Sequence, residues 1–355
     1  VKVEDPRGGD GTRMAPPYAS SGESGPHVAL NRGRRSLAVD LKHPEGRALL
    51  LELVAASQVL VDSFRPGVLE RLGLGPDSLA VANPSLVHVS ITAYGDGDMA
   101  ALPGHDLNAE GYAGLLSLAL GPGGAPAMPA VPVADLTAAL HAVVAVLAGL
   151  RRAESGQGGL RADVPMVDAA LTLATMASGT VAVTGNAPAA PDLLSGALAC
   201  YRPYRCADGL WVACAGLEPK FFARTVELLG RGDLAARQYD VDGQEALAEE
   251  LAALFGARPR ADVLALLEHE DTCVSPVHDV AAAMAAAAAR GSIVHAHLAD
   301  GTPVPVISAV PWLPGAGAGD GAGAPGLGAD TDEVLAQAGL APVRVAALRE
   351  AGVVA

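Results

Sequence analysis

The chain has 355 residues, a formal net charge of −15, and a composition that is 50% hydrophobic and 18% charged. This length favours two domains and provides enough apolar residues for a large buried core. The acidic balance excludes a nucleic-acid-binding class, which needs a basic surface to meet phosphates. A membrane span is not expected, since no run of about 18 uninterrupted apolar residues occurs. The many Gly, Pro and Ala residues are typical of a GC-rich bacterial genome.

The first third of the chain alternates strands and helices. "VKVEDP" predicts a strand, residues 7–35 a polar loop, and "HPEGRALLLELVAAS" a helix with Pro44 in its first turn. "QVLVDSF" predicts a second strand, the following 22 residues a helix, a turn and a helix, and "VHVSITAYG" a third strand. This order predicts an α/β fold with a parallel sheet, whose ligand sites lie beyond the carboxyl ends of the strands.

Helical patterns follow from residue 107 to residue 190, interrupted by a Pro/Gly/Ala loop at 121–132. The segment "AAPDLLSGALACYRPYRCADGLWVACAG" then predicts short strands that open a second domain, and "AAAMAAAAAR" at 281–290 predicts a packed helix. "GAGAGDGAGAPGLG" predicts a linker and "ADTDEVLAQAGL" a final helical segment. We therefore expect a large α/β domain over 1–190, a small α+β domain over 191–305, and a linker with C-terminal helices over 306–355 that return to the large domain.

Common cofactor and metal motifs are not convincing in this chain. Gly321, Gly323 and Gly326 satisfy GxGxxG, but they lie in a Gly/Ala tract that neither follows a strand nor opens a helix. The cysteines have no CxxC spacing and predict reduced, mostly buried thiols in a cytoplasmic protein: Cys200, Cys206, Cys214 and Cys273. No HExxH, EF-hand or GxSxG pattern occurs, and we expect no bound metal.

Two helix starts carry the most suggestive chemistry. His105 follows Pro103-Gly104 and precedes Asp106, and Asp135 opens the apolar helix "DLTAALHAVVAVLAGLRR". Each has a purely structural interpretation, His105 as a turn residue and Asp135 as a helix cap stabilised by the dipole. Asp135 nevertheless follows an extended Pro-flanked segment, where ligands bind in α/β folds. The residues alone leave both interpretations open.

Basic residues gather at loop-to-helix junctions in an otherwise acidic chain. Arginine matches phosphate oxygens with two parallel donors, and helix starts add backbone N–H groups, so an anionic ligand is one interpretation and a solvated surface the other. The residues are Arg32, Arg34, Arg35, Lys42, Arg65 and Arg71.

Several segments in the same order resemble the family III CoA-transferases (the CaiB/BaiF superfamily) and their α-methylacyl-CoA racemase branch. They are "NRGRRSLAVDLK", "SFRPGVLERLGLGPDSL", "GHDLN", "ADLTAAL", "CADGLWVACAGLEPKFF", "DTCVSPV" and "LGADTDEVL", and they span residue 1 to about residue 340. The resemblance implies a large Rossmann-like domain, a small domain and an interlocked homodimer. It also implies an active site between one subunit's large domain and the partner's small domain.

The resemblance also implies site residues. His before the Asp of "GHDLN" is typical of the racemases, so His105 is expected to be one base and Asp135 the other, with Glu218 supporting the histidine and Asp106 a neighbouring acid of the site. The reaction implied is inversion of a 2-methylacyl-CoA thioester by proton removal on one face and delivery on the other. Backbone N–H groups at the helix start near Asp135 are expected to hold the enolate oxygen.

By the same resemblance, the CoA phosphates are expected on Lys42, Arg65 and Arg71, with Lys2 a further position. CoA is part of the substrate, and no separate cofactor is expected.

Two alternatives stay open at this point. In a CoA-transferase, Asp135 would attack the acyl thioester as a nucleophile and His105 would be unnecessary. In a non-catalytic CoA-binding protein, the fold would persist without turnover. Departures from the family pattern include "DLTAAL" where glycines are usual, Ser195 in "LLSGAL" where an Asp is usual, and "AYGDGDMAALPG".

The chain begins on "VKVE" without an initiator Met. The family usually has a first strand and helix before this point, and a parallel sheet without them would expose an edge. Two expectations follow: either the true start lies upstream, or the protein is compromised.

Overall fold

The computed structural model describes residues 1–188, 190–308, 310, 312–313 and 321–355. The chain forms two compact units, one of residues 1–102, 139–164 and 281–355, and one of residues 103–138 and 165–280. The domain boundaries expected at 190 and 305 stay a prediction. Residues 315–320 of the predicted linker lie outside the described part.

The first unit contains the parallel strands. β1 (Lys2–Glu4) pairs in parallel with β2 (Ser36–Ala38). β3 (Val59–Asp62), β4 (Val87–Thr92) and β5 (Leu160–Pro165) form a sheet in that order, and β3 and β4 run parallel from the Val59–Val87 pair. The α/β prediction with parallel strands is therefore confirmed.

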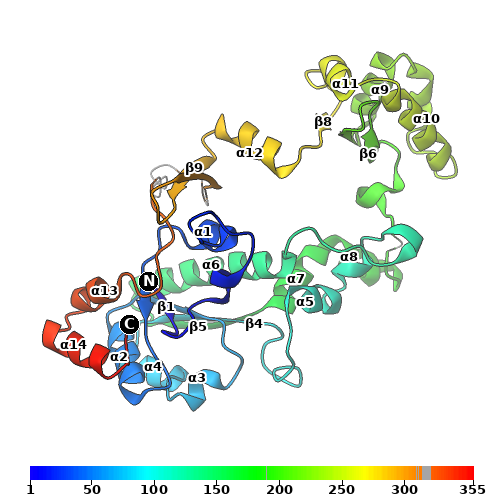
Figure 1. Ribbon diagram of the computed structural model, residues 1–355. Coiled ribbons are helices and arrows are strands. Elements are labelled where there is room, and N and C mark those ends of the chain that lie inside the picture. Colours follow the sequence, from blue (N-terminus) through cyan, green and yellow to red (C-terminus); the bar gives the residue numbers. More distant parts are fainter. Residues whose placement is uncertain (189, 309, 311, 314–320) are drawn as a thin grey trace. The chain divides into compact units, whose positions relative to one another are not determined.

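Helices cover both faces of the β3–β4–β5 sheet (Figure 1). On one face lies α6 (Val133–Glu154), whose Gly149 is so close that a Cβ there would be 2.5 Å from a methyl group of Val87 on β4. On the other lie α2 (Pro44–Ala55), α3 (Val68–Arg71) and α4 (Pro76–Ala82), which share a buried leucine-rich core. This packing fixes the carboxyl ends of β3 and β4.

The unit is completed by elements from both chain ends. α13 (Thr331–Gln337) and α14 (Pro342–Glu350) pack with β2 and α2 in a second core. β9 (Ile293–His297) and β10 (Pro303–Ile307) form an antiparallel pair. Near the N-terminus the unit also contains two short helices, η1 (Gly11–Met14) and α1 (Gly25–Asn31).

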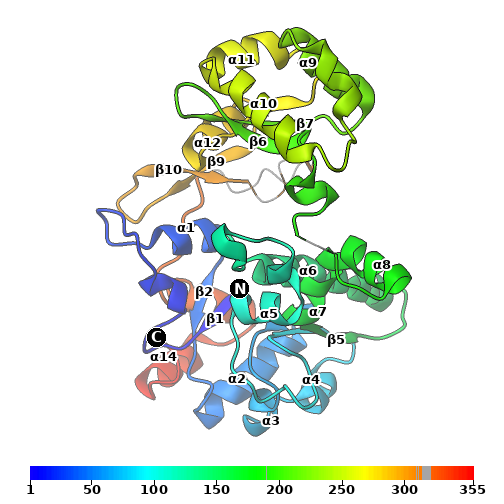
Figure 2. The same ribbon diagram turned by 90° about the vertical axis from the view of Figure 1, so that its right-hand side faces the viewer.

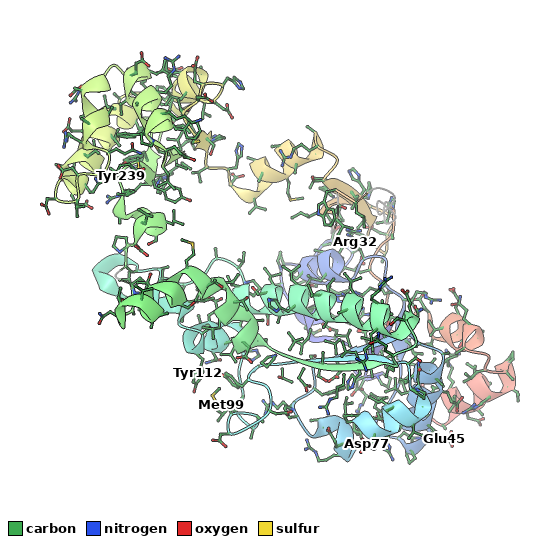
Figure 3. All side chains as sticks on the ribbon, turned by 180° about the vertical axis from the view of Figure 1, so that it is seen from behind. Arg32, Glu45, Asp77, Met99, Tyr112 and Tyr239 are labelled. Atoms are coloured by element: carbon green, nitrogen blue, oxygen red, sulfur yellow. The ribbon has the colours of Figure 1, made fainter. Side chains whose placement is uncertain are left out.

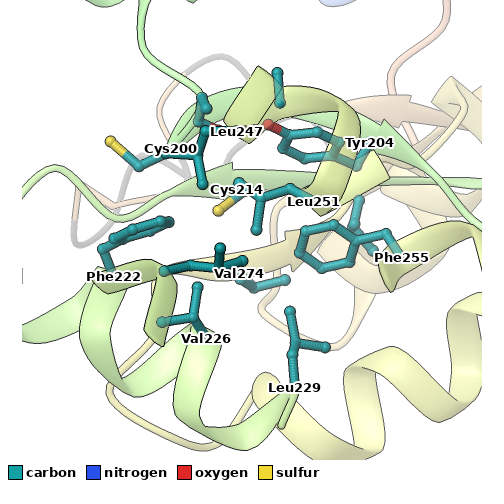
Figure 4. Close-up of a cluster of buried hydrophobic side chains, with 14 of the residues drawn as sticks. Cys200, Tyr204, Cys214, Phe222, Val226, Leu229, Leu247, Leu251, Phe255 and Val274 are labelled. Atoms are coloured by element: carbon teal, nitrogen blue, oxygen red, sulfur yellow. Dashed lines mark hydrogen bonds between the residues drawn. The ribbon is translucent and has the colours of Figure 1, made fainter. Parts of the chain in front are cut away.

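The second unit contains the antiparallel strands β6 (Tyr201–Arg205), β7 (Trp211–Ala215) and β8 (Val274–Pro276). Figure 2 shows α9 (Pro219–Leu228), α10 (Gln244–Gly256) and α11 (Arg260–Leu267) packed around them. Their core includes Phe222 and a stacked pair, Tyr204 and Phe255, with ring centroids 5.0 Å apart (Figure 4).

The same unit contains the helices that follow β4 and β5 in the chain. These are α5 (Asp106–Tyr112), α7 (Met166–Leu171) and α8 (Thr175–Thr184), with α5 in contact with α7. Short helical turns are η2 (Leu115–Ser117), η3 (Pro122–Gly124), η4 (Thr172–Ala174), η5 (Leu193–Ala197) and η6 (Gly232–Arg237).

Three local predictions were wrong. The expected loop at 7–35 contains α1, started by Ser24 as N-cap and Pro26 in the first turn. Within the range 107–190 expected to be helical, residues 160–165 form the strand β5, and the next helix begins only at Met166. The alanine-rich segment does form α12 (Val280–Ala288), but none of its residues is buried, so helix propensity and not packing accounts for it.

Two helical stretches are long and apolar enough to cross a membrane by length and composition, Val133–Glu154 and Met166–Thr184. On α6 the exposed apolar side chains recur at helical spacing and form one stripe: Leu136, Leu140, Val143, Val144 and Leu147. A subunit interface would also account for such a stripe.

Candidate active site

The start of α5 fixes His105. The backbone of His105 is extended, with φ −120° and ψ 179°, and its N–H donates to Asn108 Oδ1 at 3.1 Å. Asn108 is the third residue of the helix, and a side chain at this position that accepts the N–H of the N-cap residue is typical of a capping box. The helix ends at exposed Tyr112 (Figure 3). His105 itself is exposed, so its imidazole is accessible to a ligand and to solvent.

The start of α6 fixes Asp135 next to α5. The helical hydrogen-bond pattern begins directly after Pro132, whose carbonyl accepts the N–H of Leu136 at 3.1 Å. Asp135, in this first turn, donates its backbone N–H to Asp106 Oδ1 at 3.0 Å. A carboxylate from the first residue of α5 therefore joins the starts of the two helices that carry His105 and Asp135.

The surroundings of Asp135 shift the pKa of its carboxyl. Burial raises the pKa of its carboxyl, the neighbouring Asp106 raises it further, and His105 lowers it. A carboxyl whose pKa is moved toward neutrality exchanges protons more readily at physiological pH.

A third carboxyl, Glu110, completes this arrangement, and it was not among the residues expected from the sequence. Its side chain is 2% exposed, and it accepts the N–H of Val133 at 3.3 Å. Burial raises the pKa of Glu110, and its hydrogen bond to the Asp106 carboxyl raises it further. The only signal in the sequence is an acidic residue among small ones in "NAEGYAG".

Two of the N–H groups at this helix start already have acceptors. Glu110 accepts the N–H of Val133 and Asp106 that of Asp135, and the expected binding of an enolate oxygen at this helix start stays a prediction. Buried donors of a first helical turn need acceptors, and here two carboxyls of α5 supply them.

Glu218 lies elsewhere in the second unit, as the N-cap residue of α9. It is exposed, and its charge is one cause, after burial, of the raised pKa of Cys273. In the described part of the chain no hydrogen bond or ion pair joins Glu218 to His105 or Asp135. Its predicted support of the histidine stays a prediction.

The residues expected to bind phosphates lie in the first unit. Across the described ranges, no ion pair engages Lys42, Arg65 or Arg71, so their charges are available to an anion. Lys2 differs, because its Nζ contacts Asp10 at 2.6 Å and Asn31 at 3.1 Å. Its charge is balanced internally, and its expected role in phosphate binding stays a prediction.

Arg65 lines a hollow of about 460 Å³, including its solvent-open part, at the carboxyl ends of β3 and β4. Within it, Asp62 Oδ2 lies 2.8 Å from His88 Nε2 and accepts the Ser90 hydroxyl at 2.8 Å. Burial acts to raise the pKa of Asp62, but these hydrogen bonds outweigh it and lower that pKa.

These three residues do not form a hydrolytic triad. Both Asp62 and Ser90 lie near the same ring nitrogen of His88, Nε2, whereas a triad uses opposite nitrogens. The group instead ties the ends of the two strands together.

The remaining motifs have structural explanations. The Gly321 carbonyl lies 2.8 Å from His297 Nδ1, and a Cβ at Gly323 would be 2.3 Å from the His297 carbonyl oxygen, so the glycine tract packs on β9. Among the residues the structure describes, no group of three or more His, Cys, Asp or Glu side chains could hold a metal ion.

The chain belongs to CoA-transferase family III, whose sequence pattern it matches over residues 1–331. It is 32% identical over 253 residues to human alpha-methylacyl-CoA racemase, covering 70% of this chain and 66% of that enzyme. It is 29% identical over 320 residues to succinate–glutarate CoA-transferase of Agrobacterium fabrum, covering 86% and 80%.

The fold is similar to the crystal structure of a CAIB/BAIF family protein from Brucella suis. The TM-score is 0.82 at 28% identity, over 95% of this chain and 90% of that one. The family expected from the sequence is confirmed, and its members include both racemases and CoA-transferases.

Proposed function

We propose that the protein is a racemase that interconverts the (2R) and (2S) forms of a 2-methylacyl-CoA thioester by two-base proton transfer. The observation that carries the proposal is the pairing of His105 and Asp135 at adjoining helix starts, with the pKa of Asp135 raised by burial and by Asp106. A base that must return its proton needs a pKa near the working pH.

In this mechanism one base removes the α-proton and the thioester becomes an enolate. The other base, already protonated, delivers its proton to the opposite face of the same carbon. The two groups then hold reversed protonation states and reset through solvent, to which both exposed side chains have access. The reaction needs no separate cofactor.

The runner-up function is CoA transfer between carboxylic acids through an aspartyl-CoA thioester on Asp135. It is supported by the likeness to the Agrobacterium enzyme and by the exposure of the Asp135 carboxyl. A nucleophilic carboxylate must be ionised, so a raised pKa is a disadvantage in that reaction and an advantage in proton transfer.

We further propose that the protein works as a cytoplasmic homodimer in which Glu218 reaches the partner's His105. Two observations support this arrangement. Among the described residues no hydrogen bond or ion pair joins Glu218 to His105 of the same chain, and the exposed stripe on α6 offers an apolar surface for a second copy. The Lys42, Arg65 and Arg71 side chains would bind the nucleotide phosphates.

The test is incubation of a (2R)-2-methylacyl-CoA in heavy water, with and without a carboxylic acid acceptor. We expect deuterium at the α-carbon together with loss of configuration, independent of the acceptor. CoA transfer to the acceptor without α-exchange would reverse the order of the two functions. Retention of CoA with neither reaction would point to a binding protein.

A further inference from the structure

Glu110 is a buried carboxyl that accepts an N–H of the α6 start, and its burial beside a second carboxyl calls for an explanation beyond this cap. It lies on α5, four residues after Asp106, so one helical turn brings the two carboxyls to the same face. Its side chain is 2% exposed, whereas the side chains of His105 and Asp135 are exposed. A buried carboxyl without a positive partner is costly unless it is protonated or fully hydrogen-bonded.

The contacts of Glu110 show how that cost is met. Oε1 accepts the Val133 N–H at 3.3 Å, and the carboxyl is hydrogen-bonded to that of Asp106. Two ionised carboxylates only accept, so a hydrogen bond between them requires one shared proton. Asp106 likewise accepts one N–H, that of Asp135 at 3.0 Å, but it is only partly buried, so the shared proton belongs to the more deeply buried Glu110, whose charged form burial disfavours more.

We propose that Glu110 is a positioning residue whose protonated carboxyl donates to Asp106 and accepts from Val133, and so holds the α6 start that carries Asp135 against the α5 start that carries His105. This inference rests on the proposed function for its kinetic consequence, but its structural content is independent of which reaction the site performs.

The shared proton has a second consequence for the site. Asp106 accepts hydrogen bonds from both Glu110 and Asp135, and its charge raises the pKa of Asp135. Removing the Glu110 carboxyl would leave the Val133 N–H without its acceptor and Asp106 free to turn. Glutamine keeps both bonds, because its carbonyl oxygen accepts and its amide donates.

The kinetic test compares Glu110→Gln with Glu110→Ala in the full-length protein. With Gln we expect kcat for α-exchange close to wild type. With Ala we expect kcat to fall on the order of 100-fold, because small displacements of a base have such effects, while KM for the acyl-CoA stays nearly unchanged. Equal loss of kcat in both variants, or wild-type kcat in both, would overturn the proposal.

A matched control is Glu154→Gln, an exposed carboxyl at the other end of α6, about 28 Å from Asp135 along the helix. It replaces a carboxyl on α6, the helix that carries Asp135, without touching the site. We expect wild-type kcat and KM. A fall in kcat equal to that of Glu110→Ala would show a general effect of charge and overturn the proposal.

Two readouts are independent of activity and separate this inference from the proposed function. In infrared spectra at neutral pH, the wild type should show the C=O band of a neutral carboxylic acid that Glu110→Gln removes. Amide hydrogen exchange at Val133 should be slow in wild type and in Glu110→Gln, and fast in Glu110→Ala. Absence of the infrared band, or equal exchange at Val133 in all three proteins, would overturn the proposal even if the protein racemises. If both signals are found in a protein that transfers CoA, the positioning role of Glu110 is upheld and only the racemase function is refuted.

Discussion

Replacing His105 or Asp135 alone should show which base acts on which face of the α-carbon of the substrate. Asp135 is held through its backbone N–H by Asp106, and not by the imidazole of His105. His105→Ala should therefore leave Asp135 in place and able to exchange its proton with solvent. We expect this variant to exchange the α-proton of the enantiomer that faces Asp135 without inverting it, and to leave the other enantiomer unlabelled. Asp135→Asn should show the opposite preference.

The magnitude follows from what each base contributes. A positioned general base is worth about 10²–10⁴ in rate, so racemisation should fall by that factor in either variant. This equals about 3–5 kcal/mol of activation free energy at 1.36 kcal/mol per tenfold. His105 is exposed, and loss of a helix cap costs only about 1 kcal/mol, so the variants should stay folded.

The assay is deuterium incorporation from heavy water, followed separately for the two enantiomers by NMR, with chiral analysis of the recovered acyl group. Thermal unfolding and CoA binding serve as controls. Racemisation by His105→Ala at the wild-type rate would refute the assignment of His105. Each variant could instead lose exchange from both enantiomers alike while it keeps its fold and its CoA binding. That result would refute the assignment of one base to each face.

Mixing His105→Ala subunits with Glu218→Ala subunits should restore about a quarter of wild-type activity, since half of the random dimers are mixed and each has one intact site; no recovery after subunit exchange would contradict a shared site. Leu147→Lys places a charge in the exposed stripe of α6 and should shift the protein toward monomers in analytical ultracentrifugation, whereas an unchanged dimer would contradict the proposed interface. Arg71→Ala should raise KM more than it lowers kcat in steady-state kinetics, and the reverse would argue against phosphate binding. The Asp62 pKa is lowered in the folded state, so its stabilisation is present above its ordinary value of 3.8 and is lost as pH falls through the folded pKa. Asp62→Asn should cost about 1–3 kcal/mol at neutral pH and less in acid, as measured by urea unfolding, and an equal cost at both would contradict this linkage.

Elements with strong local signals were predicted well. β3 and β4 are short apolar runs next to helices, and Pro44 marks the start of α2, so their types could be inferred from the sequence. β2 gave no such signal, because its three residues, Ser36–Ala38, are all buried and show no alternation. Its position depends on pairing with β1, a contact between residues more than thirty apart.

The residues of the candidate site also differ in how well the sequence predicts them. His105 and Asp135 stand at helix starts that Pro103-Gly104 and Pro132 mark in the sequence, so both could be found there. Glu110 could not, since its role comes from burial and from a contact with Val133, twenty-three residues away. Periodicity places it on a helix but does not reveal a carboxyl shared with Asp106.

The most direct measurement of the central claim is mass spectrometry of protein and substrate from one incubation with 2-methylacyl-CoA in heavy water. The account predicts that the substrate gains deuterium at its α-carbon while the protein carries no covalent CoA adduct, because protons alone pass through Asp135. A covalent CoA thioester on Asp135, with no deuterium in the substrate, would contradict it.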